Sequence, residues 1–135
     1  MFYKRLLILF YCIISTFIHA EENNIFFMVE TSIANYTPFF LAGNKTLTIN
    51  SFNQESDISE TNDFAIPPMT LAQQTHKEKT FFNIEYTKIS LKTADDEILT
   101  CQPSSLLFKS KVSGTKTTLV VYYNEYEHTC LIEQI

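Results

Sequence analysis

The stretch LLFKSKVSGTKTTLVVYYNEYEHTCLI, residues 106–132, decides the fold of this chain. Apolar and polar residues alternate along it, as they do in strands that bury one face. Two pairs of turn-forming residues, Ser-Gly at 113–114 and Asn-Glu at 124–125, interrupt the alternation. If each pair forms a two-residue hairpin loop, both registers place the same set of side chains on one face. The stretch therefore predicts a three-stranded antiparallel meander.

The two faces of this predicted meander differ in composition. The face expected to point into the core carries Leu106, Phe108, Val112, Leu119, Val121, Tyr123, Tyr126, Cys130 and Ile132. His128 falls on the same face, where we expect a hydrogen-bonded structural histidine. The opposite face holds the candidate binding surface, which comprises Lys109, Lys111, Lys116, Val120, Tyr122 and Leu131. A tyrosine ringed by lysines can anchor an acidic or amphipathic partner, so this surface is a hypothesis for binding.

Segments elsewhere in the chain have strand composition too. Residues 24–31, 45–52, 79–91 and 98–101 alternate or are rich in β-branched and aromatic side chains. A short helix at residues 69–74 is left open by the sequence. Together with the meander, these segments give about seven or eight strands. The sequence predicts a single all-β domain with little helix, either an antiparallel β-sandwich or a partly open barrel.

The segment at residues 79–91 also predicts an irregularity inside its strand. Phe82, Ile84 and Tyr86 share one parity, whereas Ile89 and Leu91 have the opposite one. A β-bulge adds one residue to a strand and would return the last two side chains to the core face.

The first twenty residues have the layout of a secretory signal peptide. Lys4 and Arg5 precede an apolar run of 13 residues, 6–18, and the small residue Ala20 follows it. The run is shorter than the roughly 20 residues that span a bilayer as a helix. We therefore predict cleavage after Ala20, which leaves 21–135 as a single β-domain that is secreted or periplasmic. No later segment is apolar enough to predict a transmembrane span.

The charge of the predicted mature chain argues against two classes of partner. Without Lys4 and Arg5, 8 basic residues remain against 15 acidic ones, a formal charge of −7. Phosphate binding needs clustered positive charge, so nucleic acid is not expected as a partner. An anionic membrane surface is disfavoured for the same reason, which leaves a protein or an envelope component as the expected kind of partner.

Cys101 and Cys130 are the two cysteines that remain after the leader is removed. In an exported protein such a pair predicts a disulfide, which would stabilise the fold by about 3–4 kcal/mol in the chain-entropy view. Two alternatives stay open. The cysteines could join His76 and His128 in a zinc site, or His128 could activate Cys130 as a nucleophile.

Two sequons for N-linked glycosylation are present, NYT at Asn35 and NKT at Asn44. They have meaning only if the chain passes through a eukaryotic secretory pathway. Pro38 directly follows the first and makes it a poor acceptor.

The sequence leaves three classes of function open. The leading hypothesis is a small exported binding module, adhesin-like, inhibitor or effector, with no cofactor, metal or catalytic residue assigned. The alternatives are a small secreted hydrolase that uses carboxylates or His128, and an envelope-associated protein that assembles through strand edges. An enzyme should show a deep pocket with a histidine or close carboxylates, a binding module an exposed aromatic patch, and an assembling protein a long uncovered edge strand.

Overall fold

The computed structural model describes residues 25–50 and 58–135, and every regular element in this part of the chain is a β-strand. The predicted all-β class is therefore confirmed, and residues 69–74 belong to a strand and not to a helix. The predicted signal peptide at residues 1–20 lies outside the described residues. No helix that could cross a membrane occurs in the described part. The nine strands are β1 (Phe27–Asn35), β2 (Phe40–Ile49), β3 (Ile58–Ile66), β4 (Thr70–Glu78), β5 (Phe82–Lys92), β6 (Ile98–Gln102), β7 (Leu106–Lys109), β8 (Thr115–Asn124) and β9 (Thr129–Gln134).

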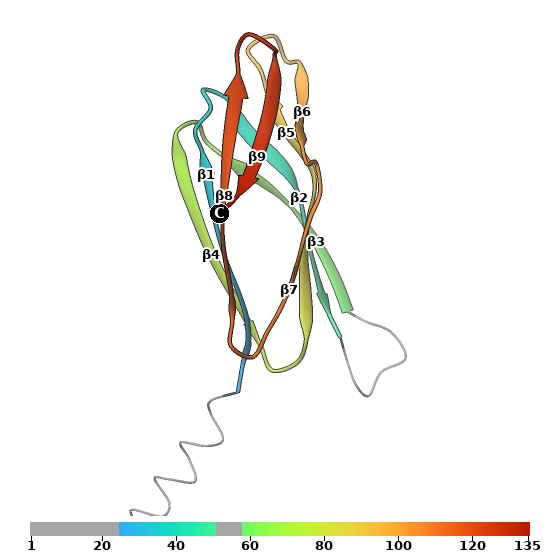
Figure 1. Ribbon diagram of the computed structural model, residues 1–135. Coiled ribbons are helices and arrows are strands. Elements are labelled where there is room, and N and C mark those ends of the chain that lie inside the picture. The colour runs from blue at the N-terminus through green and yellow to red at the C-terminus, as the bar shows by residue number, and fades with distance from the viewer. Residues whose placement is uncertain (1–24, 51–57) are drawn as a thin grey trace, which may run out of the picture.

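The strands form a nearly closed, barrel-like sheet in the order β3-β2-β5-β6-β9-β8-β1-β4, and β7 pairs with β5 outside this path. The pairs β1–β8 and β6–β9 are parallel, and the other pairs are antiparallel. β3 and β4 stand at the two ends of the order although they are consecutive in the chain. Figure 1 shows these two strands diverging from their short connection, so the barrel is open on the side between them.

The first predicted hairpin is wrong, because β7 pairs with β5 and not with β8. Two hydrogen bonds hold the end of β7 against β5. The Ser110 amide donates to the Phe82 carbonyl, and the Ser110 hydroxyl accepts from the Phe82 amide, each at 3.0 Å. A turn closed by the Gly114 amide on the Lys111 carbonyl then carries the chain to the other layer. Alternation specifies which face of a strand is buried but not which neighbour it takes, so Phe108 is buried as expected in a different pairing.

The second hairpin, β8–β9, exists with a longer loop than predicted. Its last pair is Asn124 with Thr129, so residues 125–128 form the loop. The Asn124 side chain accepts hydrogen bonds from the amides of Tyr126 and Glu127, at 3.0 and 3.2 Å, and this widens the turn. The register changes by an even number of residues, which preserves the inner face. Tyr126 and His128 lie in the exposed loop, and their predicted place in the core is wrong.

The remaining core predictions follow the same logic. Phe108, Leu119, Val121 and Cys130 are buried, whereas Val112 lies in the β7–β8 turn and is exposed. The other predicted inward residues, Leu106, Tyr123 and Ile132, are partly buried against the core.

The predicted bulge in β5 is confirmed. Ala42 pairs with Ser90 and Asn44 with Thr87, so two residues of β5 oppose Gly43 alone. Lys88, the extra residue, has a φ of 52° in the left-handed region. The bulge returns Ile89 and Leu91 to the core, where they are buried with Phe82, Ile84 and Tyr86.

Cys101 and Cys130 form the predicted disulfide. They are direct neighbours on the parallel strands β6 and β9, with their Cα atoms 4.4 Å apart. The bond therefore joins adjacent strands, at the end of the molecule where β6 and β9 close one side of the barrel (Figure 1). Such a bond fits a protein that matures in an oxidising compartment.

Candidate functional site

The open side between β3 and β4 is the main interruption of the sheet. Each of these strands is nine residues long, and in the described part of the chain each pairs with only one neighbour, β2 or β1. An edge strand presents a row of backbone N–H and C=O groups that no ladder satisfies. This side of the barrel therefore offers two facing rows of backbone hydrogen-bonding groups.

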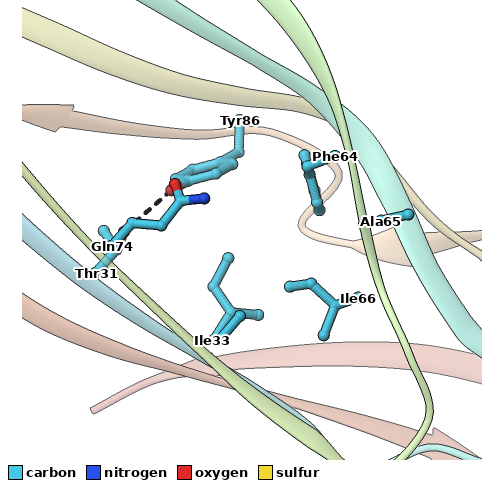
Figure 2. A pocket seen from close by; sticks show the side chains of 8 residues that line it. Thr31, Ile33, Phe64, Ala65, Ile66, Gln74 and Tyr86 are labelled. Carbon is cyan, nitrogen blue, oxygen red and sulfur yellow. Dashed lines mark hydrogen bonds between the residues drawn. The ribbon is translucent and has the colours of Figure 1, made fainter.

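An apolar cavity of about 100 Å³ opens between the two edges. Figure 2 shows Ile33, Ile66 and Phe64 around it, with the Tyr86 ring at one end. The Phe64 and Tyr86 rings meet edge to face, with their centroids 5.5 Å apart. The cavity is lined by Thr31, Ile33, Phe64, Ala65, Ile66, Ala72, Gln74 and Tyr86.

A buried hydrogen bond of 3.0 Å joins the Tyr86 and Thr31 hydroxyls at this cavity (Figure 2). Burial raises the pKa of Tyr86, and the hydrogen bond from Thr31 partly opposes that rise. Tyr86 is therefore a neutral hydroxyl in the interior across the physiological range. With Thr31 and Gln74, it is one of the polar side chains that line the otherwise apolar cavity.

The narrow end of the opening is fixed by Asn35, at the end of β1. Its side-chain amide donates to the carbonyls of Phe39, Ile66 and Pro67 at 2.9 to 3.1 Å. Its carbonyl accepts from the amide and the hydroxyl of Thr37. Because Ile66 ends β3, these bonds hold the β3 end against β1, and the opening widens from there. The NYT sequon thus contains a fully buried asparagine whose amide serves this network.

Farther along the same two strands the lining becomes polar. A second hollow, of about 170 Å³, is lined by Lys45, Leu47, Glu60, Asn62 and His76. Lys45 on β2 reaches across the opening and donates a hydrogen bond of 2.7 Å to the Gln74 side chain on β4. Partial burial lowers the pKa of Lys45. The opening therefore has an apolar section followed by a section with a lysine.

His76 borders the polar section and is positioned by two contacts. Its Nε2 atom lies 2.9 Å from Glu78 Oε1, and its ring packs edge-on against Phe82 with centroids 5.1 Å apart. Within the described residues, no group of three or more His, Cys, Asp or Glu side chains could hold a metal ion. His128 lies elsewhere, in the β8–β9 loop, with Nδ1 2.8 Å from the Tyr123 hydroxyl and Nε2 3.4 Å from Glu97.

The predicted binding surface is divided by the real topology. Tyr122 and Leu131 are cross-strand neighbours on β8 and β9, and both are exposed. Val120 is only 5% exposed, because it lies on the outer face between β1 and β9, so its predicted surface position is wrong. Lys116 lies six residues before Tyr122 on β8, about 20 Å along the strand.

The remaining two lysines of that surface are farther away. Lys109 ends β7 in the other layer, and Lys111 lies in the turn after it. The expected ring of lysines around Tyr122 depended on the β7–β8 hairpin, which does not form.

Sequence reasoning missed the open side because none of the predicted strand segments covers β3, and residues 69–74 in β4 were left undecided. β3 has six consecutive exposed residues and so lacks the alternation that identifies strands. A usable signal was the polar residue Lys45 inside the apolar alternation of β2. It marks a place where the inner face is not sealed.

Comparison with protein-family models, with curated proteins and with solved structures found no match to this chain. The class is therefore defined by the fold and the site: a small, disulfide-bonded, nearly closed β-barrel that is open between two edge strands.

Proposed function

We propose that this protein is a binding module that takes an extended peptide segment of its partner along the opening between β3 and β4. One observation carries the proposal. Among the described residues, two nine-residue strands with one free edge each face each other across a cavity in the core. An extended peptide can add to such an edge, with the main chain supplying affinity and side-chain pockets supplying specificity.

The cavities indicate which side chains such a peptide would present inward. The apolar cavity, at about 100 Å³, is smaller than the roughly 150 Å³ cavity that holds a benzene molecule, so it suits one aliphatic side chain. The ammonium group of Lys45 is held by a neutral amide, Gln74, and an acidic side chain of the partner would be a stronger acceptor. Along a strand, residues two or four apart share a face. We therefore expect an aliphatic residue and an acidic residue at that spacing.

An array of nine-residue peptides tests this proposal with the oxidised protein. Half of the peptides carry an aliphatic and an acidic residue two or four positions apart, and the other half contain the same residues in scrambled order. We expect binding to concentrate in the first half. Equal binding to both halves would contradict the proposed recognition.

Lys45→Met provides the matched test of the side-chain part, because it keeps the length of the side chain and removes its charge. We expect this variant to lose the preference for an acidic residue while it keeps the aliphatic one. Lys109→Met, at the end of β7 on the far side of β5 from β2, is the control and should bind as the unmodified protein does. A preference that persists in Lys45→Met would exclude Lys45 as the partner of the acid.

The backbone part has its own test. Peptides N-methylated at every second amide, in the two complementary sets, lack the donors that face one edge or the other. Strand addition predicts that at least one set loses binding. Retained binding by both sets would show that the peptide does not pair with an edge.

A second candidate function rests on the same edges. An envelope-associated protein that assembles through strand edges would use β3 and β4 of successive copies, since both are uncovered in the described residues. Light scattering distinguishes the two, because edge assembly continues to grow with protein concentration and peptide binding does not.

Export belongs to the same proposal, and the disulfide supports it. If residues 1–20 are a secretory signal peptide, the exported protein begins at Glu21. Mass spectrometry of the secreted or periplasmic protein measures this directly, and a mature species that retains Met1 would refute cleavage.

A further inference from the structure

The outer face of the sheet formed by β4, β1, β8 and β9 carries a group of exposed apolar side chains, here called the outer patch. It lies on the side of the barrel that is left of centre in Figure 1. The outer patch consists of Tyr36, Leu71, Tyr122, Leu131 and Ile135, each between 41% and 77% exposed.

The strand register makes these side chains neighbours. Leu71 pairs with Ala34, Ala34 with Val120, and Tyr122 with Leu131. The Tyr36 amide donates to the Val121 carbonyl, and the Tyr36 and Tyr122 rings stack with centroids 6.2 Å apart. Ala34 and Val120 are small and buried, so they form the floor between the larger exposed side chains. The patch is therefore continuous across four strands.

The patch is almost free of charge. Within it, Glu133 is the cross-strand partner of Val120 and contributes the one charged side chain among the paired residues of these rows. The next row of outward-facing residues, toward the start of β8, carries Ser32, Gln73 and Thr118, which are all uncharged. Contiguous apolar patches rimmed by polar residues mark protein interaction sites.

Apart from Glu133, the charged side chains on this face lie toward the two ends of the molecule, above and below the patch. One end, the acidic tip, consists of the loops at 93–97 and 125–128 and carries Asp95, Asp96, Glu97, Glu125 and Glu127. Lys92, whose ammonium nitrogen lies 3.6 Å from Asp96, compensates part of this charge, and the His128 ring lies 3.4 Å from Glu97. The opposite end, here called the base of the molecule, carries the lysines Lys77, Lys79, Lys109, Lys111 and Lys116. Glu30, opposite Lys116 on β1, and Glu78, beside His76, are acidic residues of this end.

From this arrangement we infer that a second copy of the chain packs on the outer patch, related by a two-fold axis that runs the two copies in opposite directions. Isologous packing places the same surface of both copies in contact, so the patch covers itself. With the axis near Val120, Lys116 lies four residues toward the base and Asn124 four residues toward the tip, each about 13 Å away. Lys116 of one copy then faces the Glu125 loop of the other, which gives two such pairs in the dimer. The row of Val120 and Glu133 runs along the axis, so the two copies of Glu133 face each other there and oppose part of this attraction. A parallel arrangement would place both acidic tips together, which electrostatic repulsion opposes.

Sedimentation equilibrium of the oxidised protein tests this inference over a range of protein concentrations and salt. We expect a monomer–dimer equilibrium that stops at two copies and weakens as salt rises, because the end-to-end charge pairs are screened. A monomer at all concentrations, or a mass that keeps rising beyond two copies, would overturn the proposal.

Charge exchange distinguishes this dimer from other ways of self-association. Lys116→Glu should weaken dimerisation at least about tenfold, and the double variant Lys116→Glu with Glu125→Lys should recover most of that loss. Lys109→Glu, which changes the same charge on the other layer, is the control and should leave the dimer unchanged. A double variant that remains as weak as Lys116→Glu would exclude the antiparallel arrangement.

Removing the apolar contact provides an independent readout. Tyr122→Ala together with Leu131→Ala should abolish the dimer while near-ultraviolet circular dichroism remains native, because both side chains are exposed. A dimer that persists would place the interface elsewhere. Peptide binding uses the free edges of β3 and β4 and the cavity between them, whereas the dimer uses the outer face, so the array separates a failure of this inference from a failure of the proposed function.

Discussion

The hydroxyl of Tyr86 on β5 and the hydroxyl of Thr31 on β1 share a hydrogen bond of 3.0 Å in the interior. These strands belong to opposite layers of the barrel and are not neighbours in the sheet order. The bond therefore ties the layers together beside the open side, where the backbone ladder is interrupted. It is a polar link across the core at the cavity between β3 and β4.

Tyr86→Phe removes this bond and leaves the Thr31 hydroxyl buried without its partner. We expect a loss of about 1–2 kcal/mol in the free energy of unfolding, measured by urea denaturation. Tyr126→Phe is the matched control, because Tyr126 is fully exposed in the β8–β9 loop. Equal stability of Tyr86→Phe and the parent would show that the bond contributes nothing net.

The pH dependence of stability follows from the same residue. Burial raises the pKa of Tyr86 above its ordinary value of 10.0, so the folded state keeps the proton at a pH where the unfolded state loses it. The stabilisation is complete below pH 10 and is lost as pH rises through the folded pKa. Urea denaturation across this range should show the decline in the parent and a smaller one in Tyr86→Phe. Identical slopes would contradict the burial effect.

Gly43 is predicted to tolerate no side chain, because it faces the bulge in β5. A Cβ atom there would lie 2.8 Å from the Thr87 carbonyl oxygen and 2.8 Å from the Phe64 ring. The ring can move but the carbonyl belongs to the backbone. We expect Gly43→Ala to destabilise the fold by about 1–3 kcal/mol, as overpacking does. Thermal denaturation measures this, with Asn44→Ala at the next position of β2 as the control; comparable losses in both would point to strand propensity.

The bulge shows what a linear pattern can reveal about this fold. The change of parity between Tyr86 and Ile89 is a local feature of the sequence, and in the structure a bulge within β5 accounts for it. The inner faces of β8 and β9 were predictable for the same reason, since a register error of an even number of residues leaves the faces unchanged. The disulfide was predictable from the number of cysteines and from the compartment that the first twenty residues predict.

The neighbours of each strand were not predictable in this way. The alternation of Leu106 and Phe108 fits a pairing with β8 or with β5 equally well, and the choice depends on hydrogen bonds of Ser110 to a residue 28 positions away. The parallel pairing of β1 with β8 joins distant parts of the chain and leaves no local signal. Both the outer patch and the open side depend on such pairings. The candidate sites could therefore not be predicted from the sequence, although the fold class could.

The disulfide is expected to contribute about 3–4 kcal/mol, since it closes a loop with a sequence separation of 29. Replacing both Cys101 and Cys130 by Ala should lower the free energy of unfolding by that amount in urea denaturation. Thiol labelling of the denatured, unreduced parent should find neither of these two thiols free. Two titrating thiols in the exported protein would contradict the bond in solution.

Asn35 gives the most severe substitution that the structure predicts. Its amide group donates to three backbone carbonyls and its side chain is almost completely buried, at 1% exposure. Asn35→Asp replaces this donor with a carboxylate oxygen that would face those carbonyl oxygens, and a buried charge without a partner costs several kcal/mol. We expect a loss of at least about 3 kcal/mol in urea denaturation at neutral pH, reduced at acidic pH where the carboxyl group is protonated.

The matched control is Asn44→Asp, which makes the same change at a half-buried position of β2. Asn35→Ala separates the two contributions, because it removes the donor without adding a charge and should cost less than Asn35→Asp. Hydrogen exchange supplies the mechanistic readout. The end of β3 at Ile66 is held to β1 by the Asn35 amide, so amides there should lose protection before those of β8. Uniform loss of protection across the sheet would mean that Asn35 supports the whole core and does not specifically fix the narrow end of the opening.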